Sequence, residues 1–283
     1  MSSLGIIIKF IFATDASMFA GRYHGSSSSA ITYANMIMTV IILLTYTIFQ
    51  KRTQNIYRIL LTLALVLTLT FIWSQTLTRG SLIGLILCFV LIILWNKRFR
   101  LIMFLGSSLL LFFIYLSPVG ERLDNFLINL NNINFSTLEN STIENRSLNQ
   151  RFAYSIFAIE NIIKNPIMGI GASNVEQVMT TDFRNKRGIL VAVADHVHNE
   201  YLDIALKFGT ISLVIFLFIW ITILYDFIKC KKNDLSYALV LTIISHMSYM
   251  LTQSIFAHHQ ASVFFIILLY ILLPNLYSIN KKT

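Results

Sequence analysis

Charged residues are scarce in this sequence. They make up 12% of its 283 residues, whereas hydrophobic residues make up 56%, and the mean hydropathy is +0.70. Soluble globular domains carry about 25% charged residues, so the composition excludes that class. It instead predicts a polytopic membrane protein, because a helix that crosses lipid needs roughly 20 mainly apolar residues.

Cysteines and the common catalytic motifs are also scarce or missing. The two cysteines, Cys88 and Cys230, are far apart in the expected topology and predict no disulfide framework. The sequence has no glycine-rich phosphate loop, no Gly-x-Ser-x-Gly elbow, no His-Glu-x-x-His and no Asp-x-Asp pair. Chemistry driven by a bound nucleotide is therefore unsupported, and we predict neither a cofactor nor a metal ion.

Long apolar runs, by contrast, are abundant. Seven of them are long enough for a membrane span, at residues 31–49, 59–74, 81–95, 101–116, 209–228, 235–256 and 262–279. Most of the short turns between them carry Lys and Arg, notably residues 51–58, 96–100 and 229–234. Cytoplasmic turns have this bias, so the net charge of +9 indicates membrane orientation rather than nucleic-acid binding.

These turns predict an all-α, polytopic membrane helical bundle with one large, partly helical outer loop. The expected order is an outer segment (1–29), four spans (30–116), the outer loop (117–208), three spans (209–279) and a cytoplasmic tail (280–283). Apart from this loop, the chain offers little that could fold in water. A chemical site is therefore expected where the loop meets the spans.

The outer loop contains one clear helical pattern. Phe152, Ile156, Ile159 and Ile163 recur at helical spacing, and Asn165-Pro166 should stop the helix. Residues 168–174 then form a glycine-bearing turn. Arg151 is expected in the first turn of this helix, where backbone amides and its guanidinium would both face a phosphate. The alternative is an ordinary surface charge.

His198 stands just before the fifth apolar run. If a helix begins near Asp195, His198 shares a face with Ala205 and Gly209, above the bilayer. A neutral imidazole can take a proton from an attacking hydroxyl, and Asp195 or Glu200 could orient it. The alternative is an interfacial histidine that only binds water. Both interpretations stay open on spacing alone.

Three further side chains could belong to the same site. His196 lies two residues away, but no third ligand is close enough in sequence to make an H-x-H metal site. Arg79 ends a turn at the outer end of a span, where it either snorkels or binds an anion. Arg187 closes a short basic run whose other interpretation is a solvated turn.

The stretch HNEYLDIALKFGTIS (198–212) resembles the O-antigen ligase family. That family's pattern is His, a small polar residue, nine residues, Gly, two residues, and then Gly, Thr or Tyr. His198, Asn199 and Gly209 match, whereas Ser212 departs from it. QTLTRGSL around Arg79 and NQRFAYSIFAIENIIKNPIMGIG (149–171) resemble two further family segments, and the resemblance covers about residues 30–279.

The resemblance implies an enzyme of the bacterial inner membrane with a periplasmic active site. It would transfer O-antigen glycan from undecaprenyl diphosphate to lipid A-core without a metal. Carried over to this chain, His198 is the base, with Asn199 and His196 supporting it, and Arg79 and Arg151 bind the diphosphate. Arg187 is a weaker candidate for the same anion. Family members usually have more spans, so the first ones are expected to be missing here.

Other functions fit the same residues. An O-antigen polymerase or a protein O-oligosaccharyltransferase would use the same carrier with a different acceptor. A flippase or transporter of lipid-linked sugar would instead need polar residues in mid-span, and Asn35, His246 and Gln253 are the candidates. Membrane lipid is an expected partner under every hypothesis, and nucleic acid under none.

Overall fold

The structure is a computed structural model. It describes residues 18–19, 22–23, 29–48, 55–76, 78, 80–95, 108, 143–186, 194–229 and 234–274. Arg79 and Arg187 lie outside the described residues, and so does the expected span 101–116 apart from Ser108. The regular elements of the described part are helices, apart from one short ladder in which β1 (Met18–Phe19) pairs antiparallel with β2 (Arg22–Tyr23). An all-helical fold is confirmed to that extent.

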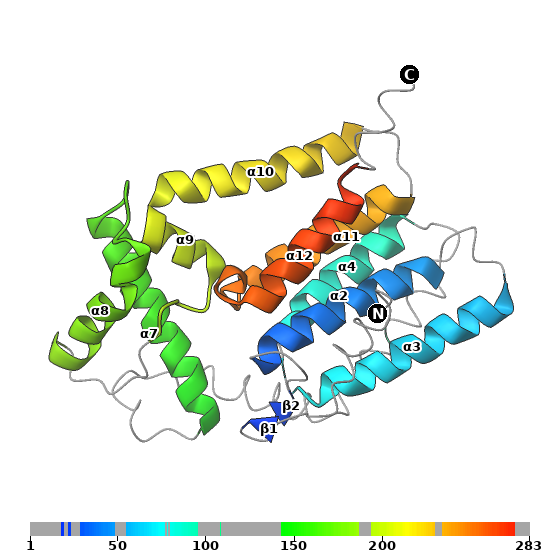
Figure 1. Cartoon of the computed structure of the whole chain (residues 1–283), viewed down its shortest axis with the longest axis horizontal. Coiled ribbons are helices and arrows are strands. Elements are labelled where there is room, and N and C mark those ends of the chain that lie inside the picture. Colours follow the sequence, from blue (N-terminus) through cyan, green and yellow to red (C-terminus); the bar gives the residue numbers. More distant parts are fainter. Residues whose placement is uncertain are drawn as a thin grey trace, which may run out of the picture. The chain divides into compact units, whose positions relative to one another are not determined.

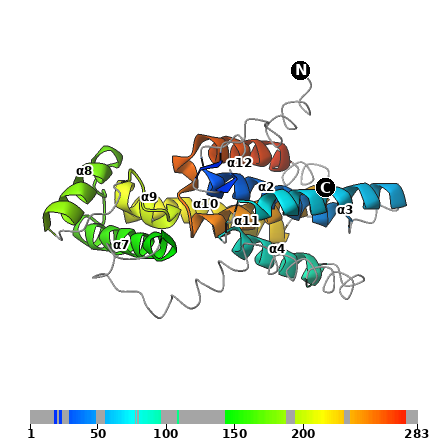
Figure 2. The ribbon, with the colours of Figure 1, turned by 90° about the horizontal axis from the view of Figure 1, so that it is seen from below.

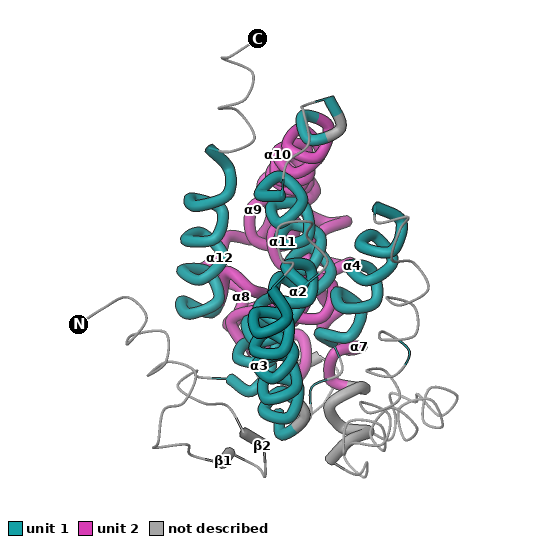
Figure 3. Tube along the Cα trace, turned by 90° about the vertical axis from the view of Figure 1, so that its right-hand side faces the viewer, with its two compact units in different colours: residues 1–122, 226–249, 258–283 teal, residues 123–225, 250–257 magenta. Residues whose placement is uncertain are grey.

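The chain divides into two compact units, coloured separately in Figure 3. Unit 1 comprises Met1–Arg122, Asp226–Tyr249 and His258–Thr283, and unit 2 comprises Leu123–Tyr225 and Met250–Ala257. The helices of unit 1 are α2 (Ala30–Ile48), α3 (Ile56–Ser74), α4 (Ser81–Trp95), most of α11 (Asp234–Met250) and α12 (His259–Leu272). Those of unit 2 are α7 (Ile143–Lys164), η3 (Ala172–Asn174), α8 (Val175–Thr180), η4 (Thr181–Lys186), α9 (Glu200–Phe208), most of α10 (Thr210–Lys229) and η5 (Ile255–Ala257).

Three of the described helices are long and apolar enough to cross a membrane, at Ala30–Ile48, Ile56–Trp73 and Thr210–Phe227. They coincide with three of the seven predicted spans. Ser81–Trp95 and His259–Leu272 are shorter apolar helices at two further predicted positions. The predicted number of spans and their orientation remain predictions.

Unit 1 is a bundle of apolar helices, and in two perpendicular views α2, α4, α11 and α12 run alongside one another (Figures 1 and 2). The Trp73 indole donates to the Ser81 hydroxyl over 2.8 Å and joins α3 to α4. His246 of α11 stacks on Phe265 of α12, with ring centroids 4.1 Å apart. Such packing suits a lipid environment, where polar groups must be satisfied internally.

Unit 2 has its own hydrophobic core, formed where α7 packs against α8, η4 and α9. Tyr154, Phe157 and Ala158 of α7 are buried there with Met179 and Phe183. Helical spacing predicted α7 correctly, and Lys164 ends it directly before Asn165-Pro166, as expected. The residues of the Phe152–Ile163 pattern do not form the core face of this helix, because Phe152, Ile159 and Ile163 are exposed on the side opposite to Tyr154 and Phe157.

Candidate functional site

The site of unit 2 is formed by α7, the segment 194–200 and the segment Met250–Ala257. The sequence predicted one apolar run at 235–256, but α11 ends at Met250. Leu251–Ser254 form a turn and η5 follows. The physical reason is that the backbone groups of this segment find partners outside the helix. The carbonyls of Leu251 and Thr252 accept hydrogen bonds from other parts of unit 2.

Arg151 reaches this segment from α7. Its Nη1 donates to the carbonyl of Thr252 over 3.2 Å, a contact between residues 101 positions apart. The expectation that Arg151 lies in the first helical turn is wrong, because α7 already begins at Ile143. Eight residues of helix correspond to about 12 Å. The amides at the start of α7 are therefore too distant to share an anion with the guanidinium of Arg151.

His198 also contacts this segment. Its Nδ1 lies 3.0 Å from Oε1 of Gln253, 55 positions away. An amide oxygen can only accept, so Nδ1 carries a proton in this contact, and the neutral form of the imidazole then has its lone pair on Nε2. A histidine in this tautomer can act as a base through Nε2. The partner is neither Asp195 nor Glu200, which were the candidates from the sequence.

The backbone of His198 is unusual. It is the one described non-glycine residue with a positive φ, at 56°. Left-handed backbone is costly for a side chain larger than glycine, and such residues gather at functional sites. The strained backbone turns the chain between Val197, which is buried in the core of unit 2, and the start of α9.

Aromatic rings surround the imidazole of His198. The Tyr154 ring centroid lies 5.7 Å away, and the His196 ring meets it edge-on at 4.5 Å. Tyr154 follows Arg151 by about one helical turn, so both side chains lie on adjoining parts of α7. The Gln150 amide donates to the Tyr154 hydroxyl over 2.9 Å. Burial raises the pKa of that hydroxyl, although the bond from Gln150 opposes the shift, so Tyr154 contributes a neutral ring.

Asn199 fixes where α9 begins. Its Oδ1 accepts a hydrogen bond from the Leu202 amide over 3.1 Å, which is the usual bond of a helix N-cap. Its Nδ2 donates to the carbonyl of Leu251 over 3.2 Å. The helix therefore starts at Glu200, and the expectation of a helix from Asp195 that carries His198 on its face is wrong. A supporting role for Asn199 has a geometric basis in these two bonds.

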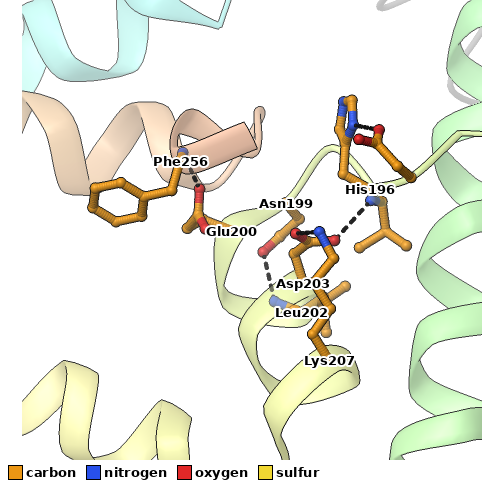
Figure 4. A network of polar contacts seen from close by, with 9 residues as sticks. His196, Asn199, Glu200, Leu202, Asp203, Lys207 and Phe256 are labelled. Atoms are coloured by element: carbon orange, nitrogen blue, oxygen red, sulfur yellow. Dashed lines mark hydrogen bonds and ion pairs between the residues drawn. The ribbon is translucent and has the colours of Figure 1, made fainter. Parts of the chain in front are cut away.

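The carboxylates near His198 are occupied by structural bonds, drawn in Figure 4. Asp195 bonds the ring Nδ1 of His196 over 2.6 Å, which lowers the pKa of the aspartate. Asp203 accepts from the Val197 amide over 3.1 Å and pairs with Lys207 over 2.6 Å. Burial nevertheless raises the pKa of Asp203. These bonds hold the segment 195–203 in place and leave neither carboxylate on His198.

Glu200 is buried, and its Oε2 accepts from the backbone N–H of Phe256 over 2.9 Å. Removal from water raises the pKa of this carboxyl to about 7, and the neighbouring charge of Asp203 adds to the rise. The bond to Phe256 is a second link between α9 and the segment Met250–Ala257. Glu200 thus positions the segment that carries Gln253 and does not contact the imidazole.

Two glycines let the turn after α7 cross the junction of α9 and α10. Gly169 has a φ of 66°, and a Cβ there would come within 2.5 Å of the Leu206 carbonyl oxygen. Gly209 has a φ of 87°, and a Cβ there would overlap the carbonyl of Ile167. The Thr210 amide and hydroxyl both donate to the Pro166 carbonyl, each over 2.7 Å. The glycine of the motif at 198–212 is therefore required by a close backbone crossing.

The structure thus brings together four of the six predicted site residues, namely Arg151, His196, His198 and Asn199. Gln253 and Tyr154 were missed as site residues. Gln253 did carry a signal, because a polar residue within an apolar run needs a buried partner. Among the described residues, no three His, Cys, Asp or Glu side chains gather as a metal site. That the reaction proceeds without a metal ion remains a prediction.

Comparison with protein families places the chain. A family model described as O-antigen ligase matches residues 63–217, which is more than half of the chain. The matched range includes the predicted site residues and Gly209 but ends before Gln253. No curated protein matches the chain.

Proposed function

Because this chain belongs to the O-antigen ligase family, we propose that it is a membrane glycosyltransferase that caps lipid A-core with O-antigen glycan. The donor is the glycan linked to undecaprenyl diphosphate, and the acceptor is a hydroxyl of a core sugar. The reaction takes place at the periplasmic face of the bacterial inner membrane, since the predicted orientation puts the loop 117–208 outside. Arg151 and His198 both belong to that loop.

One observation carries the proposal: the hydrogen bond between His198 Nδ1 and Gln253 Oε1. It supports a fixed imidazole whose Nε2 is basic. In the proposed step, Nε2 takes the proton of the acceptor hydroxyl while the oxygen attacks the anomeric carbon of the donor. The bond from that carbon to the diphosphate oxygen breaks, and undecaprenyl diphosphate leaves with the electron pair.

The leaving diphosphate needs fixed positive charge. Arg151 is tied to the Thr252 carbonyl, next to the residue that orients His198, so base and guanidinium share one supporting segment. Arginine stays protonated at every working pH and has several donors in a planar fork, which suits phosphate oxygens. Arg79 and Arg187 keep their proposed role as further diphosphate ligands.

The test is in vitro transfer with purified full-length protein, undecaprenyl diphosphate-linked glycan and lipid A-core, without and with chelator. Wild type should form glycan-capped core, and His198→Ala should not, at equal protein recovery. Normal capping by His198→Ala would contradict the proposed base. Loss of the wild-type reaction on adding chelator would contradict metal independence.

The product distinguishes this activity from that of related enzymes on the same carrier. A polymerase would lengthen the carrier-linked glycan and leave the core unmodified, and a protein O-oligosaccharyltransferase would glycosylate only a protein acceptor. Either product in place of capped core would overturn the ligase assignment while keeping the role of His198.

A further inference from the structure

Helix α7 has two apolar faces on opposite sides. Its inner face, with Tyr154, Phe157 and Ala158, fills the core of unit 2. The other face carries Phe152, Ile156, Ile159 and Ile163, and Ile167 and Met168 follow in the turn after the helix. We call these six residues the outer stripe. A helix that is apolar on both sides is expected to be covered on both sides.

Within the structure the outer stripe is exposed except for Ile156, which is half-buried. Ile163 and Met168 are 73% and 81% accessible, and Phe152, Ile159 and Ile167 are also exposed. Isolated exposed hydrophobic residues are common on protein surfaces, but a contiguous apolar strip marks a contact with another apolar medium. The question is which medium covers it.

The turn that ends the stripe is fixed to the start of a candidate membrane span. Thr210, the first residue of the span Thr210–Phe227, donates through its amide and its hydroxyl to the Pro166 carbonyl. The amides of Ile170 and Gly171 donate to the carbonyls of Leu206 and Lys207 over 2.8 Å and 3.1 Å. The turn that contains Ile167 and Met168 therefore lies where α10 enters the membrane.

The surface of α10 next to this turn is itself apolar and exposed. Ile211, Val214 and Phe218 are among its exposed residues, and only 11% of the span is buried. These side chains need lipid, so the apolar surface continues from α10 through Ile167 and Met168 to the outer stripe on α7. Lys164, in the last turn of α7, is exposed and adds a cation suited to lipid phosphates.

We propose that the outer stripe lies in the membrane surface, so that α7 is an interfacial helix anchored to the entrance of α10. Helices of this type sink their apolar face about 5–10 Å into the boundary between headgroups and acyl chains. The partner is the lipid of the membrane that α10 crosses. Arg151 also belongs to α7, and its side chain bonds the Thr252 carbonyl. In the proposed arrangement, the Arg151 side chain is therefore held at the level of the lipid headgroups.

The test uses spin labels on full-length protein in lipid nanodiscs, after replacement of Cys88 and Cys230 by alanine. The spin label is attached to the outer stripe at Ile163→Cys and, in a separate variant, at Met168→Cys. Ile159→Cys replaces either variant if it does not fold. Phe218→Cys on α10 is the lipid control, and Gln177→Cys on the exposed side of α8 is the water control. Collisions with oxygen report lipid, and collisions with nickel ethylenediaminediacetate report water.

Labels on the stripe should collide more with oxygen than with the nickel complex, like Phe218→Cys and opposite to Gln177→Cys. Preference for the nickel complex would overturn the proposal, because the stripe would then face water. Low collision rates with both reagents would also overturn it, since a protein surface such as a second copy would then cover the stripe. Neither measurement needs transfer activity, so the result is independent of the proposed reaction.

Discussion

The polar side chains beside His246 in unit 1 and beside His198 in unit 2 find their partners in different places. Beside His246, the side chains bond to their own helix: Thr242 donates to the Ala238 carbonyl, and Ser245 donates to that of Thr242. His246 lies 2.9 Å from the Thr242 carbonyl and stacks on Phe265. Local bonds of this kind satisfy a polar group inside an apolar bundle without fixing any distant segment.

Around His198 in unit 2, three polar side chains reach residues that are distant in sequence. His198 contacts Gln253, Asn199 donates to Leu251, and Arg151 donates to Thr252. Each bond joins two segments and sets the position of a functional group. The comparison separates the two histidines by the origin of their partners: His198 contacts a distant segment, whereas His246 contacts its own helix. For the same reason, the environment of His246 gives little support to a transport pathway through it.

The largest effect on the transfer rate is expected when His198 and His246 are replaced in separate variants. His198→Ala should lower the transfer rate by about 10²- to 10⁴-fold, the usual contribution of a general base. His246→Phe should keep the rate near wild type, because a phenyl ring preserves the stacking on Phe265 and only about 1 kcal/mol of hydrogen bonding is lost. Transfer assays at equal protein amounts measure both variants. Equal losses of transfer rate in the two variants would contradict the distinction drawn between His198 and His246.

The next effect concerns the backbone crossing that supports the site in unit 2. Gly209→Ala should destabilise the protein by more than about 3 kcal/mol, because strain from its positive φ is combined with overlap on the Ile167 carbonyl. Gly171→Ala is the matched control: its φ is 82°, but a Cβ there meets only the Asn174 side chain, at 3.3 Å. Thermal unfolding in detergent measures both, and equal shifts would contradict a special requirement at Gly209.

A smaller effect is expected at Gln253, which we treat as a positioning residue. Gln253→Leu should reduce transfer about 10- to 100-fold, the range for groups that orient a working histidine. Gln253→Glu should keep the contact with Nδ1 and move the acid limb of the pH–rate profile upward, because a carboxylate favours the imidazolium. A purely structural role would leave the pH profile of the glutamate variant unchanged.

The smallest effect is the pH dependence of stability at Glu200. Its pKa is raised from 4.5 to about 7, so the folded state keeps a proton that the unfolded state releases. The stability of wild type should therefore fall as pH rises from about 4.5 to 7, and level off above. Glu200→Gln keeps an acceptor for the Phe256 amide and removes the charge. The free energy of unfolding of Glu200→Gln, relative to that of wild type, should increase by about 1–2 kcal/mol between pH 5 and 8.

Unfolding temperatures of both proteins across this pH range provide the measurement. Glu176→Gln on the exposed side of α8 is the control and should follow wild type at every pH. A Glu200→Gln variant with the same pH dependence as wild type would show that the buried carboxyl titrates at its ordinary value.

Much of the fold was predictable because it depends on local sequence. Apolar runs located the candidate spans, and helical spacing with Asn165-Pro166 located the end of α7. The glycine turn was predicted from its composition, and Gly169 and Gly171 have the positive φ that such a turn needs. The start of α7 was missed, because the asparagine-rich residues before Arg151 have no apolar period, yet the described part of them is helical from Ile143.

The sequence by itself determined the membrane class through its composition. The motif residues His198, Asn199 and Gly209 were selected by the resemblance to a known family, because spacing alone left the role of His198 open. Only the tertiary structure decided that Gln253, rather than Asp195 or Glu200, orients His198. It also decided which face of α7 is buried and that α11 ends at Met250. These features depend on contacts between residues 26 to 101 positions apart, about which local periodicity carries no information.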